Sequence, residues 1–136
     1  MRPTLAVLAC LAVGPAFAAD PAHDFFENKV RPLLAEHCYQ CHGPKKAMAG
    51  LRLDTAAGTK QGADTGPVIV PGKPEKSSFI HAVKRSGDAP MPPEKPLPAD
   101  AVAVFTEWVK IGAPYPADAT TAPNPTDAAK NHWAFQ

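Results

Sequence analysis

The sequence predicts a small all-α domain in which three to four short helices are joined by proline- and glycine-rich loops. Apolar residues recur at helical spacing in three stretches, and the sequence has neither an internal repeat nor strands alternating with helices. The 17 prolines and 9 glycines lie mostly between those stretches, where they favour turns over regular structure. The expected order is helix, cysteine motif, loops, helix, methionine loop and helix.

The first expected helix runs from Asp20 up to the cysteine motif. Asp20 is a good N-cap residue, and Pro21 suits the first helical position. Pro32 lies inside the apolar pattern, and we expect it to kink the helix or to divide it into two pieces, because its ring displaces the carbonyl four residues earlier. The apolar residues at helical spacing are Phe25, Phe26, Val30, Leu33 and Leu34.

Two further helices are expected, at residues 75–85 and 98–111, each with one apolar face. Residues 43–74 predict loops with short extended pieces, and residues 87–98 predict a rigid loop that contains five prolines. We expect the first and last helices to cross and to bury a common set of side chains. That set is Phe25, Phe26, Val30, Leu33, Phe105, Trp108 and Val109.

The domain organisation has three expected parts. Residues 1–18 resemble a secretory signal peptide, with a basic start, an apolar stretch and a small-residue cleavage site, and they predict export to the periplasm. Lipid attachment at Cys10 is a weaker alternative, because Leu8 is a poor residue for such a cleavage box. Residues 19–113 are the expected folded domain, and residues 114–136 read as an Ala/Pro/Thr-rich linker or the start of a following region.

Charge and cysteine content exclude several classes of function. With 14 basic and 13 acidic residues and a net charge of +1, the chain predicts no binding to nucleic acid. The apolar leader is shorter than the roughly 20 residues that span a bilayer, so we expect no specific membrane binding beyond an uncleaved leader. Without the leader only Cys38 and Cys41 remain, which is too few for a disulfide-stapled fold, and something else should fill the centre.

Cys38, Cys41 and His42 form a C-x-x-C-H motif. In this spacing two thiols can add to the two vinyl groups of a haem, and the adjacent histidine is placed under the iron as the proximal ligand. A dithiol–disulfide site is a weaker alternative, because Cys38 follows a helix and would face its negative end, which disfavours a thiolate. Structural zinc is weaker still, because the chain lacks a second C-x-x-C pair.

A haem held by His42 leaves its other face to a second ligand or to an open site. Met91 is the best candidate, because a thioether is a soft neutral ligand and the flanking prolines hold the loop extended. His81 stays open as an alternative ligand. Met48 is a poorer one, because it lies only six residues beyond His42 and would have to reach round the porphyrin edge.

Several motifs in order resemble the planctomycete-type cytochrome c domain, over roughly residues 25–113. They are Phe26-Glu27, the run from Cys38 to Gly43, residues 50–54, residues 66–72, Met91-Pro92-Pro93 and Trp108. The resemblance implies a class I-like cytochrome c fold around one covalently bound haem c. It also implies that Cys38 and Cys41 attach the haem, that His42 is the proximal ligand and that Met91 is the distal ligand.

The expected function is electron transfer by one haem c per chain with His/Met ligation, and not enzyme catalysis. One alternative is a haem enzyme or sensor with an open distal site. Another is a haem module that serves or regulates a fused catalytic domain, because members of the resembled family are commonly the N-terminal part of longer exported proteins. The expected partner is therefore a redox protein or a fused redox domain. In that family a segment like residues 132–136 often opens the following region.

Overall fold

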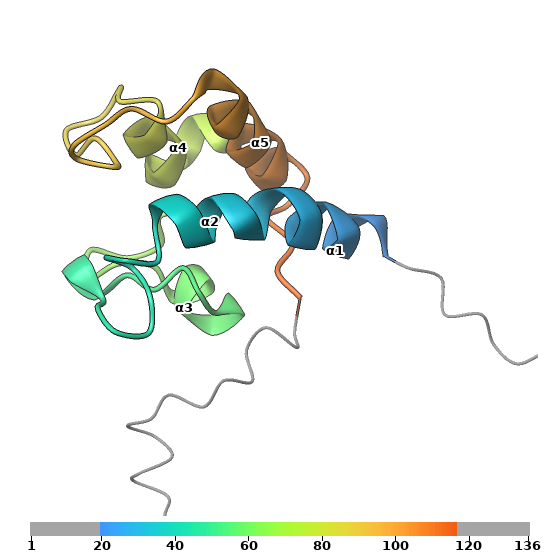
Figure 1. Cartoon of the computed structure of the whole chain (residues 1–136), viewed down its shortest axis with the longest axis horizontal. Helices are drawn as coiled ribbons and strands as arrows, with labels where there is room; N and C mark the ends of the chain where they lie inside the picture. Colours follow the sequence, from blue (N-terminus) through green and yellow to red (C-terminus); the bar gives the residue numbers. More distant parts are fainter. Residues whose placement is uncertain (1–19, 117–136) are drawn as a thin grey trace, which may run out of the picture.

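The computed structural model describes residues 20–116. Its first part, residues 21–37, forms one continuous helical rod (Figure 1). The rod consists of α1 (Pro21–Phe25), a π-helical turn (Phe26–Val30) and α2 (Arg31–His37). The Asp20 side chain accepts a 3.0 Å hydrogen bond from the Ala22 amide, so the expected N-cap is confirmed.

Pro32 interrupts the regular helix, as the sequence predicts. It lies in the first turn of α2, where its missing amide hydrogen costs least, and the π turn comes directly before it. There the Arg31 amide bonds to the Phe26 carbonyl five residues earlier. The wider turn accommodates the proline without ending the rod.

Three further α-helices complete the described part of the chain, which contains no strands. They are α3 (Ala56–Gln61), α4 (Ser78–Val83) and α5 (Ala99–Lys110), with short 3-10 turns at Met48–Gly50 and Pro74–Lys76. The all-α prediction is therefore confirmed, with the helix expected at residues 75–85 shorter than predicted. Helix α3 was not expected from the sequence; it is capped by the Thr55 hydroxyl, which accepts from the Gly58 amide at 3.0 Å.

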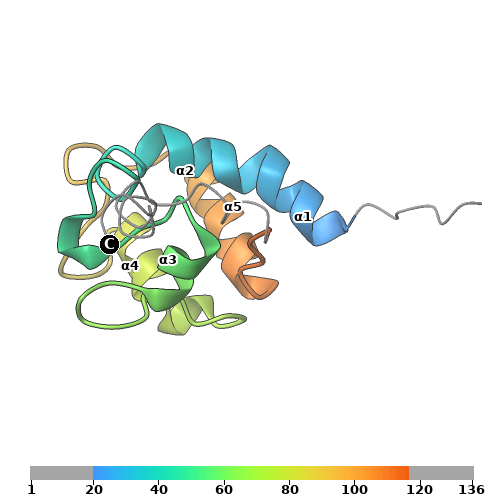
Figure 2. The same cartoon turned by 90° about the horizontal axis from the view of Figure 1, so that it is seen from below.

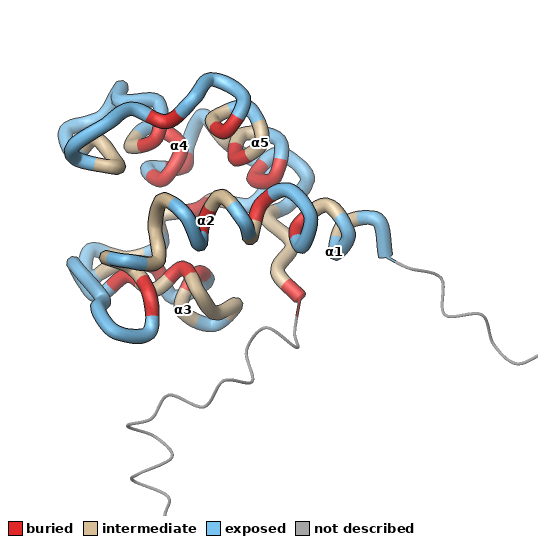
Figure 3. The backbone as a smooth tube through the Cα atoms, in the orientation of Figure 1, coloured by how far each residue is buried: buried red, intermediate tan, exposed pale blue. Residues whose placement is uncertain are grey.

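The core lies where α5 crosses the rod and contacts α4 (Figure 3). Phe26 and Trp108 meet with ring centroids 5.8 Å apart, and Phe79 packs edge-on against Phe105 at 5.3 Å. Five of the seven expected core residues are fully buried, namely Phe26, Val30, Phe105, Trp108 and Val109. The other two, Phe25 and Leu33, only pack against the edge of this core.

Residues 114–116 pack onto the domain, just past the expected boundary at residue 113. The Trp108 indole N–H donates to the Pro114 carbonyl at 2.8 Å. The ring centroids of Tyr115 and Phe26 lie 4.2 Å apart. The expected signal peptide and the remainder of residues 114–136 lie outside the described residues. Among residues 20–116 no helix has the length and apolar character needed to cross a membrane.

Two long loops lie on either side of the C-terminal end of α2. The segment that follows α2 lies on one side of the rod, and the loop that follows α4 lies on the other (Figure 1). A view from below places both loops at this same end of the molecule (Figure 2). The fold therefore brings the cysteine motif and the methionine loop to one end, although about 50 residues separate them in sequence.

Candidate functional site

The C-x-x-C-H motif is one tight turn that continues from α2. The Cys38 amide bonds to the Leu34 carbonyl at 2.8 Å, and the Cys38 carbonyl accepts from the amides of Cys41 at 3.2 Å and His42 at 2.9 Å. Both cysteines are unpaired and partly buried. Two thiols and an imidazole thus belong to a single turn, as attachment to one planar macrocycle requires.

His42 is held by the extended segment around Leu51 and Leu53. Its Nδ1 lies 3.3 Å from the Leu51 carbonyl oxygen, and its own carbonyl accepts from the Leu53 amide at 2.9 Å. Because a carbonyl can only accept, Nδ1 carries the proton, and Nε2 then keeps the lone pair that can bind a metal. A backbone acceptor on the second ring nitrogen both orients a ligating histidine and increases its basicity.

Gly43, which follows the motif, is required by close packing. It is buried, and a Cβ atom there would overlap the carbonyl oxygen of Tyr39 inside the motif. The Gly43 amide also bonds to the Lys46 carbonyl at 2.8 Å, which turns the chain away from the motif. Only glycine lets the chain leave the motif by this route.

The environment of the cysteines argues against a dithiol–disulfide site. Burial, with a smaller contribution from the nearby Cys41, raises the pKa of the Cys38 thiol to about 12. A dithiol–disulfide site needs a thiolate near neutral pH, so this environment disfavours it. Within residues 20–116 no three His, Cys, Asp or Glu side chains are grouped as a metal site.

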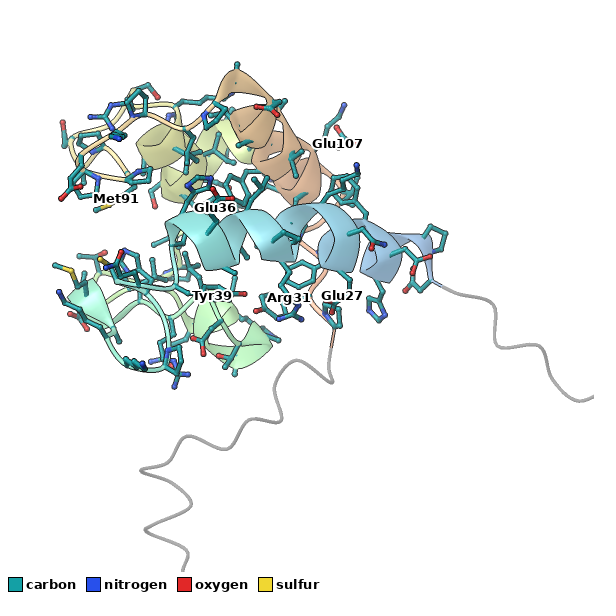
Figure 4. The ribbon with its side chains drawn as sticks, viewed as in Figure 1. Glu27, Arg31, Glu36, Tyr39, Met91 and Glu107 are labelled. Atoms are coloured by element: carbon teal, nitrogen blue, oxygen red, sulfur yellow. The ribbon has the colours of Figure 1, made fainter. Side chains whose placement is uncertain are left out.

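Met91 lies on the loop opposite the motif. Its amide donates to the Ala82 carbonyl of α4 at 3.0 Å, and the residue is partly buried. Figure 4 shows Met91 on the side of this loop that faces the segment following α2. The structure thus places the thioether and the C-x-x-C-H turn on opposing loops at the same end of the fold.

The other candidate ligands are less well placed. His81 is exposed, with Nε2 2.9 Å from the Glu75 carbonyl oxygen and Nδ1 3.2 Å from the Ser86 hydroxyl, so local contacts occupy both ring nitrogens. Met48 is 48 % exposed, and its amide bonds to the Cys41 carbonyl at 3.0 Å, so its backbone stays on the motif side. Neither has the position of Met91 on the opposing loop.

These residues fit a haem c group. A turn with two unpaired thiols, an imidazole with the tautomer of a metal ligand and a thioether on the facing loop form the donor set that a six-coordinate haem c uses. The ligand roles of Cys38, Cys41, His42 and Met91 stay predictions. A separate surface pocket of about 370 Å³, between the end of α2 and residues 92–98, is lined by none of the four.

The segment that holds His42 was not expected from the sequence to have this role. Leu51 and Leu53 act through backbone atoms, which every residue possesses, so side-chain chemistry could not reveal them. The available signal was the alternation in residues 50–54, where two buried leucines flank an arginine. That pattern indicated an extended piece, but it did not indicate that this piece lies against His42.

Comparison with known proteins supports the same identification. Residues 38–95, from the first cysteine of the motif to a point within the loop that carries Met91, match the family model described as Planctomycete cytochrome C. Neither the search of curated proteins nor the search of solved structures found a match. The matched residues contain both the C-x-x-C-H turn and Met91, and this part of the chain is therefore similar to a planctomycete-type cytochrome c domain.

Proposed function

We propose that this domain is a periplasmic electron carrier with a single haem c, bound through Cys38 and Cys41 and ligated by His42 and Met91. Its family is one of haem-based electron transfer in general. The observation that supports His42 and Met91 as the two iron ligands is the position of two opposing loops at one end of the fold. One presents an imidazole with a free Nε2 lone pair, and the other presents a thioether.

Each residue has a separate task in this proposal. Cys38 and Cys41 fix the group covalently to the turn after α2, and His42 binds through Nε2 while the Leu51 carbonyl orients its ring. Met91 fills the second axial position. The bound haem supplies reversible one-electron chemistry at iron, and a thioether ligand raises the reduction potential.

A carrier is preferred over an enzyme because both axial positions have a candidate protein ligand, which leaves no open position for a substrate. The expected leader at residues 1–18 supports export, and the compartment outside the cytoplasm is one in which haem can be attached to a C-x-x-C-H motif. The partner is then a redox protein, or a redox domain fused to this one, that exchanges electrons at the haem edge.

The decisive experiment compares two methionine variants of the purified holoprotein. In the oxidised wild type we expect haem that stays with the polypeptide after denaturation, and a thioether-to-iron charge-transfer band in the visible spectrum. M91A should abolish the band and open the reduced iron to rapid carbon monoxide binding, whereas M48A should change neither property. A wild type without the band, or an M91A variant that keeps it, would refute ligation by Met91.

The histidine alternative needs its own control. H81Q removes the ring that the sequence left open as a ligand, and its contacts to Glu75 and Ser86 predict that the haem spectrum stays unchanged. If H81Q converts the haem to a high-spin form while M91A does not, His81 is the second ligand. An enzyme or sensor with an open site would instead bind carbon monoxide rapidly in the wild type.

A further inference from the structure

The C-terminal end of α4 has an arginine where helices favour glycine. The Ser86 amide bonds to the His81 carbonyl at 2.9 Å and the Arg85 amide bonds to the Ala82 carbonyl at 3.0 Å, which together form a Schellman motif. The residue after the helix cap in this motif adopts a left-handed conformation, and Arg85 has φ of 57°. A side chain is disfavoured there because its Cβ crowds the following carbonyl.

The Arg85 side chain reaches the loop that carries Met91. Its Nη1 donates to the Pro92 carbonyl at 2.7 Å, one residue beyond Met91. This hydrogen bond is exposed to solvent, and exposed hydrogen bonds contribute little to global stability, because water replaces them readily. The strained position of Arg85 is therefore better explained by a local task than by the stability of the whole fold.

The composition of the loop explains why a side chain takes on that task. Residues 90–93 contain three prolines, so Met91 supplies the one backbone N–H of this stretch, and it is already bonded to the Ala82 carbonyl. Further attachment to α4 must therefore use a carbonyl of the loop, and that requires a donor from elsewhere. Arg85 provides that donor, and the two hydrogen bonds hold the chain on both sides of the Met91 Cα atom.

We infer that Arg85 is a positioning residue that holds Met91 in place as an axial ligand. The inference rests on the proposed haem ligation, but the clamp itself is a property of the polypeptide and can be measured separately. Loosening the loop should let Met91 leave the iron more often while the helical core stays folded. A residue that served only the fold would not separate these two properties.

The test uses R85G in the holoprotein. Glycine suits the left-handed position, so the urea midpoint for global unfolding should stay the same or rise. Hydrogen exchange at the Met91 amide should nevertheless accelerate by about tenfold, the factor expected from losing one ordinary hydrogen bond. Carbon monoxide should bind the reduced protein correspondingly faster, and heating should remove the thioether band at a lower temperature.

Two further variants serve as controls for this test. R85K retains a charged donor and should restore part of the slow exchange at Met91. A113G relaxes another left-handed residue, with φ of 51° after α5, and should leave exchange at Met91 unchanged. The inference is overturned if R85G leaves the Met91 exchange rate unchanged, or if exchange rises equally throughout the protein. If the wild type lacks the thioether band, the proposed ligation fails, whereas Met91 amide exchange in R85G still decides whether the clamp exists.

Discussion

The Tyr115 hydroxyl donates a 3.1 Å hydrogen bond to the backbone carbonyl of Leu53, in the segment that also holds His42. Because this bond uses the only hydroxyl proton of Tyr115, the Tyr39 hydroxyl must be the donor in the 3.4 Å contact between the two tyrosines. The Arg31 guanidinium lies over the Tyr115 ring, 5.6 Å from its centroid. The end of the described chain thus joins α2, the cysteine motif and the support of the proximal ligand.

Removing the Tyr115 hydroxyl should destabilise the fold. Y115F leaves the Leu53 carbonyl without this donor, and we expect the free energy of unfolding to fall by about 1 kcal/mol, measured by urea denaturation. Y39F removes only the longer contact and should cost less. The double variant should cost less than the sum of the two, because the Tyr39 hydrogen bond needs the Tyr115 oxygen. Strict additivity would show that the two hydroxyls act independently.

Ser77 should be a second point of high sensitivity. Its side chain is fully buried before α4, where Oγ accepts from the Val70 amide at 2.9 Å and donates to the Lys73 carbonyl at 2.9 Å. S77A leaves the Val70 amide without its partner and removes one of the two hydrogen bonds that the Lys73 carbonyl accepts, the other coming from the Lys76 amide. We expect a loss of about 1–3 kcal/mol in the free energy of unfolding. The matched variant S78A removes an exposed hydroxyl with one contact of 3.4 Å, and it should change stability by less than about 0.5 kcal/mol.

The ion pair between Glu27 and Arg31 predicts a small dependence of stability on acid pH. Two hydrogen bonds of 2.6 and 2.9 Å from Arg31 lower the pKa of Glu27 below its ordinary value of 4.5. The unfolded chain therefore binds the proton more readily, so the contribution to stability is present above pH 4.5 and is lost as pH falls through the folded pKa. Figure 4 shows both residues on the same side of the α1–α2 rod as Tyr39.

The size of this effect should be modest because both side chains are partly exposed. E27Q should lower the free energy of unfolding near neutral pH by a few tenths to about 1 kcal/mol. The difference from wild type should shrink in urea titrations below pH 4.5 and in high salt. E107Q is the control, because Glu107 contacts Lys110 only at 3.9 Å and its loss should cost less. A difference that grows on acidification would contradict the assignment.

The predictable parts of the fold were those with a side-chain signature. Asp20 indicated where the rod begins, and Pro32 indicated where its regular helix is interrupted. The spacing of Phe105 and Trp108 indicated the buried face of α5. Helix α3 had no such signature, because its six residues lack an apolar period and depend on the Thr55 cap. A short helix of this kind is recognised only in the three-dimensional structure, because its sequence has no apolar periodicity.

The candidate site divides in the same way. Covalent and axial chemistry restricts the residue type, so Cys38, Cys41, His42 and Met91 could be proposed as ligands from the sequence. The two segments that contain them lie at one end of the fold (Figures 1 and 2). The residues that hold these ligands in position could not be predicted from the sequence. Leu51 acts through a carbonyl, and the role of Arg85 depends on a left-handed backbone conformation that no spacing of side chains predicts.

Gly43 offers the most direct test of the motif turn itself. A methyl group at this position would overlap the Tyr39 carbonyl oxygen, so G43A must shift the turn that presents the cysteines and His42. We expect a loss of about 1–3 kcal/mol in the free energy of unfolding, together with a lower yield of covalently bound haem per polypeptide. Haem staining of the denatured protein against total protein measures that yield. G87A is the matched control, because a Cβ at Gly87 would lie at an ordinary 3.4 Å from the His81 Cβ. If G43A and G87A load haem equally well, the close packing of Gly43 against Tyr39 is not what shapes the attachment turn.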